Sequence, residues 1–153
     1  MEVRLATLDD IEAMCPLLTE FFAYNAQLHP AYCSADIERG VYPKIIIESD
    51  SADFFIAVEG NTVVGCLHID QKKTPPYTSV VPHNYAEIIS FAVAASHRER
   101  GIGAMLIKAA KQWGRARSLD YIELTSLRGA EEANRFYDNK DFTVVSCIRR
   151  YTL

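Results

Sequence analysis

The segment His97-Arg-Glu-Arg-Gly-Ile-Gly-Ala104 combines two arginines and two glycines directly after an apolar run. If that run is a strand and a helix opens after it, the first amides of the helix have no partners inside the helix and can bind an anion. Gly101 and Gly103 have no Cβ atoms to hold a phosphate away from the backbone, and Arg98 and Arg100 add positive charge. The segment therefore predicts a phosphate-binding turn or, as the plainer alternative, a tight turn without a ligand.

Two common nucleotide patterns do not fit this turn. The dinucleotide fingerprint requires three glycines and an acidic residue about 20 positions later, and a P-loop requires Gly-Lys-Ser/Thr. Neither pattern is present at residues 97–104. We therefore expect another kind of phosphate carrier, and a nucleotide-binding domain of a different fold is an alternative that competition between CoA and ADP would test.

The strands that must position this turn are predicted by short β-rich runs. These runs lie at residues 3–5, 54–58, 63–69, 87–93, 121–125 and 142–152. Gly60 and Asn61 separate two of them and supply the positive-φ residues of a tight hairpin turn. Residues 71–83 contain three prolines and two lysines, which predicts a loop.

The helices are predicted by apolar residues at helical spacing. The first should follow Thr7-Leu-Asp-Asp10, a capping sequence, and Pro16 should kink or split it. A short helix should start at Pro43, and longer ones are expected at residues 102–113 and 130–139. Because strands flank the helix after the glycine turn, their connection is a crossover and part of the sheet should be parallel.

Two separated segments resemble the GNAT superfamily of N-acetyltransferases. Val93 to Ala104 is similar to its acyl-CoA-binding motif, Arg/Gln-x-x-Gly-x-Gly/Ala after a strand ending in Val, through Arg98, Gly101 and Gly103. Residues 133–142 are similar to its Ala-x-x-Phe/Leu-Tyr-x-x-x-Gly-Phe segment. The resemblance implies an α/β (α+β) fold over a single domain, residues 1–153. Its sheet would be mixed, mostly antiparallel and twisted, with splayed central parallel strands and helices on both faces.

The resemblance also implies an activity. It is the transfer of the acetyl group of acetyl-CoA to a primary amine of a small molecule or protein, by direct attack in a ternary complex. The alternative is a non-catalytic acyl-CoA-binding or sensing module of the same fold. The cofactor-binding residues implied by the resemblance are Phe91, Ala92, Val93, Arg98, Glu99, Arg100, Gly101, Ile102, Gly103, Ala104, Asn134 and Tyr137.

Two side chains are expected to move protons in this reaction. Transfer to an amine needs a base for the ammonium proton and an acid for the departing thiolate. Glu87 resembles the general base of the histone-acetyltransferase branch, and Tyr137 resembles the general acid of the family. The alternatives are a solvated carboxylate at the strand end and an aromatic ring that only packs its helix. By the same resemblance, the amide of Val93 would polarise the thioester carbonyl.

The chain departs from the family pattern at two positions. Asp141 stands where the family usually has Gly, so this turn must adopt a conformation that Asp tolerates or follow another path. Ala130 replaces a common Asn, and Arg128 or Asn134 is expected to supply its contact. The residues available for the acceptor pocket, none of them assigned, are Phe22, Tyr24, Asn25, His29, Tyr32, Tyr42 and His83.

Composition limits the other functions. The chain has 153 residues and a net charge of −4, which argues against nucleic-acid binding carried by overall charge. No run approaches the roughly 20 apolar residues of a membrane span, and the N-terminus has no signal-peptide core, so we expect a cytoplasmic protein. The four cysteines are widely spaced, which predicts neither a metal site nor disulfides. The resemblance and the apolar last strand, with Val144, Val145 and Ile148, allow a homodimer.

Overall fold

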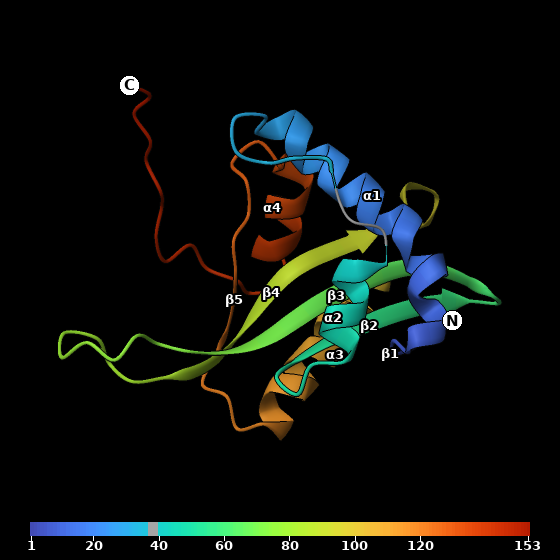
Figure 1. Cartoon of the computed structure of the whole chain (residues 1–153), viewed down its shortest axis with the longest axis horizontal. Coiled ribbons are helices and arrows are strands. Elements are labelled where there is room, and N and C mark those ends of the chain that lie inside the picture. Colours follow the sequence, from blue (N-terminus) through green and yellow to red (C-terminus); the bar gives the residue numbers. More distant parts are fainter. Residues whose placement is uncertain (37–39) are drawn as a thin grey trace.

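The computed structural model describes residues 1–36 and 40–153 and contains one mixed sheet (Figure 1). Its strands lie in the order β1 (Glu2–Leu5), β2 (Ala52–Glu59), β3 (Thr62–Lys73), β4 (Asn84–Val93) and β5 (Ile122–Leu124). The first three pairings are antiparallel, whereas β4 and β5 run parallel. This arrangement confirms the expected mixed, mostly antiparallel sheet.

Helices cover both faces of the sheet. One face carries α1 (Ile11–Leu28) and α2 (Val41–Ile47), whose residues pack with Phe54, Ile56 and Cys66. The other face carries α3 (Ile102–Ala116), and α4 (Glu131–Asp138) adds Phe136 to the edge of the same core. Two 3-10 helices are short: η1 (Leu8–Asp10) lies directly before α1, and η2 (Ala95–His97) lies before the glycine turn.

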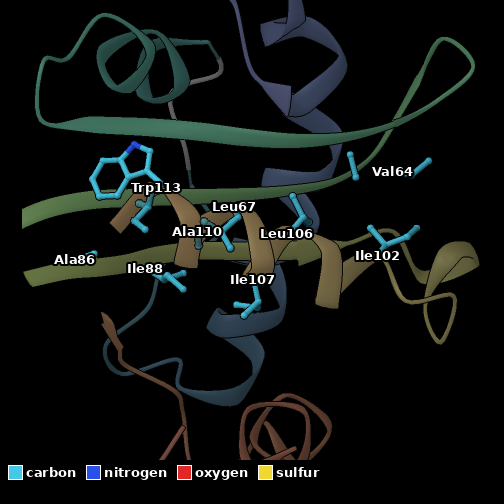
Figure 2. Packing of buried hydrophobic residues seen from close by; sticks show 11 residues of the cluster. Val64, Leu67, Ala86, Ile88, Ile102, Leu106, Ile107, Ala110 and Trp113 are labelled. Carbon is cyan, nitrogen blue, oxygen red and sulfur yellow. The ribbon is translucent and has the colours of Figure 1, made fainter. Parts of the chain in front are cut away.

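The core under α3 shows why residues 102–113 form an amphipathic helix. Ile102, Leu106 and Trp113 lie on one face of the helix, and all three are buried against the sheet. Figure 2 shows Leu106 near Leu67 of β3, with Ile102 toward one end of the row and Trp113 toward the other. This packing fixes the start of α3, and therefore the glycine turn, relative to β4.

The start of α1 follows the predicted capping sequence. The backbone amide of Thr7 donates to Oδ2 of Asp10 at 2.8 Å, and Arg4 donates to both oxygens of the same carboxylate at 2.8 Å. The hydrogen bonds from Arg4 hold the pKa of Asp10 well below its usual value. Pro16 does not split the helix, since α1 is assigned without interruption. The short second helix begins at Val41, two residues before Pro43.

The sequence-based strand limits need three corrections. β3 continues through Lys73, so the loop that follows it is shorter than the predicted segment 71–83. β5 is only three residues long, because it pairs with β4 only from Ile122 to Leu124. The strand predicted at residues 142–152 is wrong, since no strand is assigned there and the segment runs outward from the body (Figure 1). A strand needs a neighbour for its backbone groups, and this segment has none among the described residues.

Candidate active site

The two parallel strands separate after a short contact. β4 and β5 pair only at Ala86↔Ile122, Glu87↔Glu123 and Ile88↔Leu124. Beyond Ile88, β4 continues to Val93 and bonds β3 on its other side, while β5 has ended. The side of β4 that includes Phe91, Ala92 and Val93 is therefore open toward α4. This separation is the expected splay of parallel strands, but it does not lie between central strands, because β5 is the edge strand among the described residues.

A large cavity lies along this separation. It has a volume of about 1560 Å³ and is lined by parts of α1, β4, the glycine turn, the segment after β5, and α4. The expected site residues among its lining are Glu87, Phe91, Ala92, Val93, Arg98, Glu99, Gly101, Ile102, Gly103, Ala104 and Tyr137. Residues far apart in the sequence therefore meet at one site.

The glycine turn brings an unpartnered helix start to this cavity. Gly101 is the N-cap of α3 and has φ +81°, and Glu99 two residues earlier has φ +60°. These left-handed conformations turn the chain sharply from η2 into the helix. The first amides of α3, from Ile102 onward, have no intrahelical acceptors, so they are free to bind an anion.

Arg100 and Asn134 have contacts elsewhere and are not among the lining residues. Arg100 donates to Glu59 at 3.0 Å, and His97 contacts the same carboxylate at 3.2 Å, so the turn is fastened to the β2–β3 hairpin. Asn134 donates to the carbonyl oxygen of Leu127 at 3.0 Å and fixes the segment before α4. Their places in cofactor binding stay predictions.

Arg98 bridges two helices across the cavity. Its guanidinium lies 3.6 Å from Glu20 of α1 and 3.4 Å from Glu132 of α4, and its Nε donates to the carbonyl oxygen of Val93 at 3.4 Å. Both ion pairs are largely exposed, and exposed pairs contribute little to stability. Another anion can therefore replace Glu20 or Glu132 at this guanidinium with little loss of stability.

Gly103 is required by packing as well as by access to the turn. A Cβ at this position would lie 3.1 Å from ring atoms of Phe136 and 3.2 Å from Phe91. The first turn of α3 thus lies directly against two aromatic rings, one on β4 and one on α4. The contact couples the helix start to both walls of the cavity.

Tyr137 is held in place by aromatic rings. Its ring centroid lies 5.7 Å from that of Phe136, 5.9 Å from Phe142 and 6.3 Å from Phe91. Burial raises the pKa of the Tyr137 hydroxyl to about 12. None of the hydrogen bonds between described residues involves this hydroxyl, which keeps its proton at neutral pH and can donate it to a bound group.

Glu87 stands at the end of a chain of charged and polar groups. Lys72 lies 3.9 Å from Glu87 and 2.8 Å from Asp70, and Asp70 contacts Nε2 of His68 at 2.9 Å. The hydroxyl of Tyr42 lies 2.6 Å from Nδ1 of His68. The series leads from a cavity-lining carboxylate to Tyr42, a half-buried tyrosine of α2 that faces the sheet.

The surroundings of these groups shift their pKa values. Burial lowers the pKa of His68 and raises that of the Tyr42 hydroxyl, so both stay neutral at pH 7. Burial opposes the charged form of Asp70, but hydrogen bonds from Lys72 and His68 outweigh it and lower its pKa. The hydrogen bond to Asp70 raises the pKa of Lys72. The carboxylate and the ammonium beside Glu87 are therefore both charged.

Only some of the residues available for an acceptor pocket line the cavity. Of the available residues, Phe22, Tyr24, Asn25 and Tyr32 line the cavity, whereas His29, Tyr42 and His83 do not. Sequence reasoning missed Glu20, Phe21, Asp36 and residues 125–127. One signal was present in the sequence near the end of α1, where Glu20 is followed by three aromatic residues within positions 21–24. Whether these side chains face the cavity depends on how α1 crosses the sheet, which the local sequence does not specify.

Asp141 adopts the conformation that its place in the sequence requires. Its φ is +66°, in the left-handed region that Gly occupies without strain and that Asp tolerates. Ala130, at the other departure from the family pattern, is buried before α4 and donates its amide to Leu127 at 3.0 Å. The turn on each side of α4 is thus formed without the residue usual in the family.

The described residues contain neither a candidate metal site nor a candidate membrane-spanning helix. No cluster of three or more His, Cys, Asp or Glu side chains in residues 1–36 and 40–153 has the geometry to hold a metal ion. In the same part of the chain, no helix has the length and apolar character needed to cross a membrane.

Comparison with known proteins agrees with the geometry of the site. Residues 11–142 match the acetyltransferase (GNAT) family, and the chain belongs to that family. No curated protein sequence is similar enough to this chain to count as a relative. Among solved structures, a tetramutant of the BH1408 protein from Bacillus halodurans has 19% identity and a TM-score of 0.93, with 100% of each chain covered.

Two other structures share the fold at lower similarity. A ribosomal-protein-alanine N-acetyltransferase from Brucella melitensis biovar Abortus 2308 has 20% identity and a TM-score of 0.73, with 99% of this chain and 100% of that chain covered. AAC(6')-Iy in complex with the bisubstrate analog CoA-S-monomethyl-acetylneamine has 16% identity and a TM-score of 0.76, with coverage of 99% and 97%. These likenesses confirm the GNAT fold.

Proposed function

We propose that this protein is an N-acetyltransferase that transfers the acetyl group of acetyl-CoA to a primary amine within a ternary complex. The observation that carries the proposal is the cavity along the separated strands. One cavity is lined by the open side of β4, the start of α3 and Tyr137. Membership of the acetyltransferase family supports the same conclusion.

The chain's groups fit the chemistry of coenzyme A in two places. The pantetheine arm carries amides, and the open backbone of Phe91, Ala92 and Val93 can pair with them as an added strand. The pyrophosphate is an anion, which suits the free amides at the start of α3 and the charge of Arg98. The acetyl donor is the thioester group of acetyl-CoA.

Three groups of the chain have distinct roles in the proposed reaction. Glu87 accepts the proton of the acceptor ammonium, directly or through water, because a primary amine with a pKa near ~10.4 is protonated at neutral pH. The amide of Val93 donates to the thioester carbonyl oxygen. Tyr137 keeps its proton at physiological pH, because burial raises its pKa to about 12, and it donates this proton to the departing thiolate sulfur.

The walls at the acceptor end favour a cationic substrate. Asp36 and Glu87 supply negative charge, and Phe21 and Tyr24 belong to an aromatic wall on α1. Carboxylates attract ammonium groups, and aromatic faces add cation–π attraction. The acceptor we propose is therefore a small molecule or protein that presents a primary amine.

The cofactor is tested by calorimetric titration of the protein with CoA and, separately, with ADP. We expect CoA to bind at least tenfold more tightly than ADP, because only CoA has the pantetheine arm that pairs with β4. Equal affinities would contradict the proposed place of the arm and would favour a plain nucleotide site.

The roles of the two catalytic side chains are tested by Tyr137→Phe and Glu87→Gln. We expect each variant to lower kcat by about 10²- to 10⁴-fold while the Kd for CoA is unchanged. Matched controls are Tyr85→Phe and Glu123→Gln, which lie on the neighbouring strands but outside the cavity lining. Full activity of both Tyr137→Phe and Glu87→Gln would contradict these roles.

A further inference from the structure

Three carboxylates lie in a row across the strands that carry the proposed base. In the register of the sheet, Asp70 of β3 is the partner of Glu87, and Glu87 is the partner of Glu123 of β5. Partner residues on neighbouring strands point to the same face of the sheet, so each outer carboxylate adds negative charge beside the middle one. Like charges disfavour the ionised form, and a base must be ionised to accept a proton. Glu87 therefore needs a cation close to it.

Lys72 supplies this cation. Its ammonium lies 2.8 Å from Oδ2 of Asp70 and 3.9 Å from Oε2 of Glu87, so it faces two of the three carboxylates. Within residues 1–36 and 40–153, no other cation forms an ion pair with Glu87. A cation at this distance favours the charged form of the carboxylate.

The ammonium has a fixed place because Asp70 is held from inside the protein. An ionised carboxylate only accepts hydrogen bonds, so Nε2–H of His68 donates to Oδ1 of Asp70 at 2.9 Å. Nδ1 of the same ring then accepts from the hydroxyl of Tyr42 at 2.6 Å, and this hydroxyl lies 3.1 Å from that of Ser90. His68 and Ser90 are each only 2% exposed. Asp70 is thus oriented with its second oxygen toward Lys72.

The pair between Lys72 and Glu87 contributes little to the stability of the fold. The two side chains are 39% and 30% exposed, and partly exposed ion pairs are weak in this respect. The effect of the ammonium on the charge of Glu87 does not depend on a net gain in stability. Loss of Lys72 should therefore change the titration of Glu87 and leave the fold intact.

Lys72 is the only positive charge among the groups around Glu87. Tyr121 stacks on Tyr85, and the pKa values of both hydroxyls are raised, so both are neutral at physiological pH. The titratable groups that share this face or the cavity with Glu87 are Asp70, Lys72, Tyr85, Tyr121, Glu123 and Asp36.

We propose that Lys72 is a positioning residue of the reaction, because it keeps Glu87 ionised beside Asp70 and Glu123 and so able to accept the proton of the acceptor ammonium. The inference rests on the proposed function of Glu87 as the base. The proton moves from the acceptor nitrogen to the Glu87 carboxylate, and the neutral amine keeps the lone pair that attacks the thioester carbonyl. Lys72 keeps its own proton, since the hydrogen bond to Asp70 raises its pKa.

The charge of Glu87 is measured without any substrate, by ¹³C NMR of the full chain labelled at the glutamate carboxyl carbons. The Glu87 signal is the one that Glu87→Gln removes. We expect Lys72→Met to raise the pH midpoint of this signal by roughly half a unit or more, and Lys72→Arg to restore it. Lys73→Met is the matched control, because Lys73 is exposed and the side chains of successive strand residues point to opposite faces. Equal midpoints in Lys72→Met and Lys73→Met would overturn the proposal.

The consequence for the reaction is measured as the pH profile of kcat/KM. We expect the acid limb of Lys72→Met to move to higher pH by the same amount as the NMR midpoint, with full activity at alkaline pH and an unchanged Kd for CoA. A loss of activity that is equal at every pH would show a structural role and overturn the proposal. No turnover by the unmodified protein on any acceptor would refute the proposed function instead, and the NMR titration would still decide whether Lys72 controls the charge of Glu87.

Discussion

Gly103 is the residue at which the cofactor turn and the aromatic core meet. An added Cβ would lie 3.1 Å from the ring of Phe136 and 3.2 Å from Phe91. Both rings belong to the cavity lining, and Phe136 also neighbours Tyr137. A change of one methyl group therefore acts on stability and on the position of the proposed acid.

Substitution of Gly103 should lower the stability of the fold. We expect Gly103→Ala to lower the free energy of unfolding by about 1–3 kcal/mol, because the added methyl forces the rings apart. Gly114→Ala is the matched control, since its nearest atoms lie at 3.8 Å and Ala favours the helix. Urea denaturation of both variants measures the difference. A Gly103→Ala variant as stable as Gly114→Ala would show that α3 does not pack against these rings.

His68 makes stability depend on pH. Burial lowers its pKa, so the folded protein holds the proton less tightly than the unfolded chain, whose histidine has the ordinary value of 6.5. The free energy of unfolding should therefore fall as the pH drops below about 6.5, by at most ~1.4 kcal/mol per pH unit. The surrounding groups that set this response are Tyr42, Asp70, Ser90 and Lys72.

The measurement is a set of thermal or urea unfolding curves at pH 7.5 and 5.0. We expect His68→Gln to reduce the loss of stability between these two values, because the titrating ring is gone. His83→Gln removes a histidine that is 39% exposed on the β3–β4 loop and should keep the loss seen in the unmodified protein. An identical pH response in His68→Gln and the unmodified protein would contradict the assignment to His68.

At the scale of elements, Arg98 connects α1 to α4 through Glu20 and Glu132. A bound pyrophosphate would compete with these carboxylates for the guanidinium, and their negative charge also opposes the phosphates. Exposed ion pairs of this kind are worth about 0.2–1 kcal/mol. The two glutamates should therefore weaken the affinity for the cofactor modestly.

Removing one of the carboxylates should strengthen CoA binding. We expect Glu132→Gln to lower the Kd for CoA roughly two- to fivefold at low salt, and Arg98→Ala to raise it. Glu131→Gln, one position earlier on the same helix and outside the cavity lining, serves as the control. Titration calorimetry at two salt concentrations measures both effects. Weaker binding by Glu132→Gln would mean that Glu132 positions Arg98 rather than competing with the cofactor.

The sequence predicted the elements whose signals are local. The tight turn at Gly60-Asn61, the apolar stripe of α3 and the capping sequence before α1 each depend on neighbouring residues, and all three are confirmed. Positive φ was expected at both turn residues, but only Gly60 has it. The separation of β4 and β5 and the assembly of the cavity depend on contacts between distant segments. They were expected only through resemblance to a family, not through periodicity.

Distant contacts account for what sequence reasoning missed. Arg98 pairs with residues 78 positions before it and 34 after it, and His68 contacts Tyr42 across 26 positions. Nothing in the local sequence specifies these partners. The predicted last strand failed for a related reason: its residues have strand propensity, but pairing requires a neighbouring strand, and none pairs with this segment in the described part of the chain.

At the scale of the whole molecule, the two faces and the edge of the sheet have different roles. α3 packs a continuous apolar core on one face and fixes the glycine turn, while the polar series from Tyr42 to Lys72 lies on the face of α1 and α2. The cavity opens where β4 and β5 separate, so it draws on both layers. The account as a whole claims that this arrangement transfers an acetyl group to an amine.

That claim is tested most directly by incubating the protein with acetyl-CoA and a panel of polyamines, aminoglycosides, amino acids and lysine-containing peptides. Released thiol and acetylated amine are measured together, the amine by mass spectrometry. We predict that one acceptor class gains one acetyl group for each thiol released, at a rate well above that of Tyr137→Phe. Tight CoA binding with no acetylated product from any acceptor would contradict the enzyme assignment and favour a sensing module.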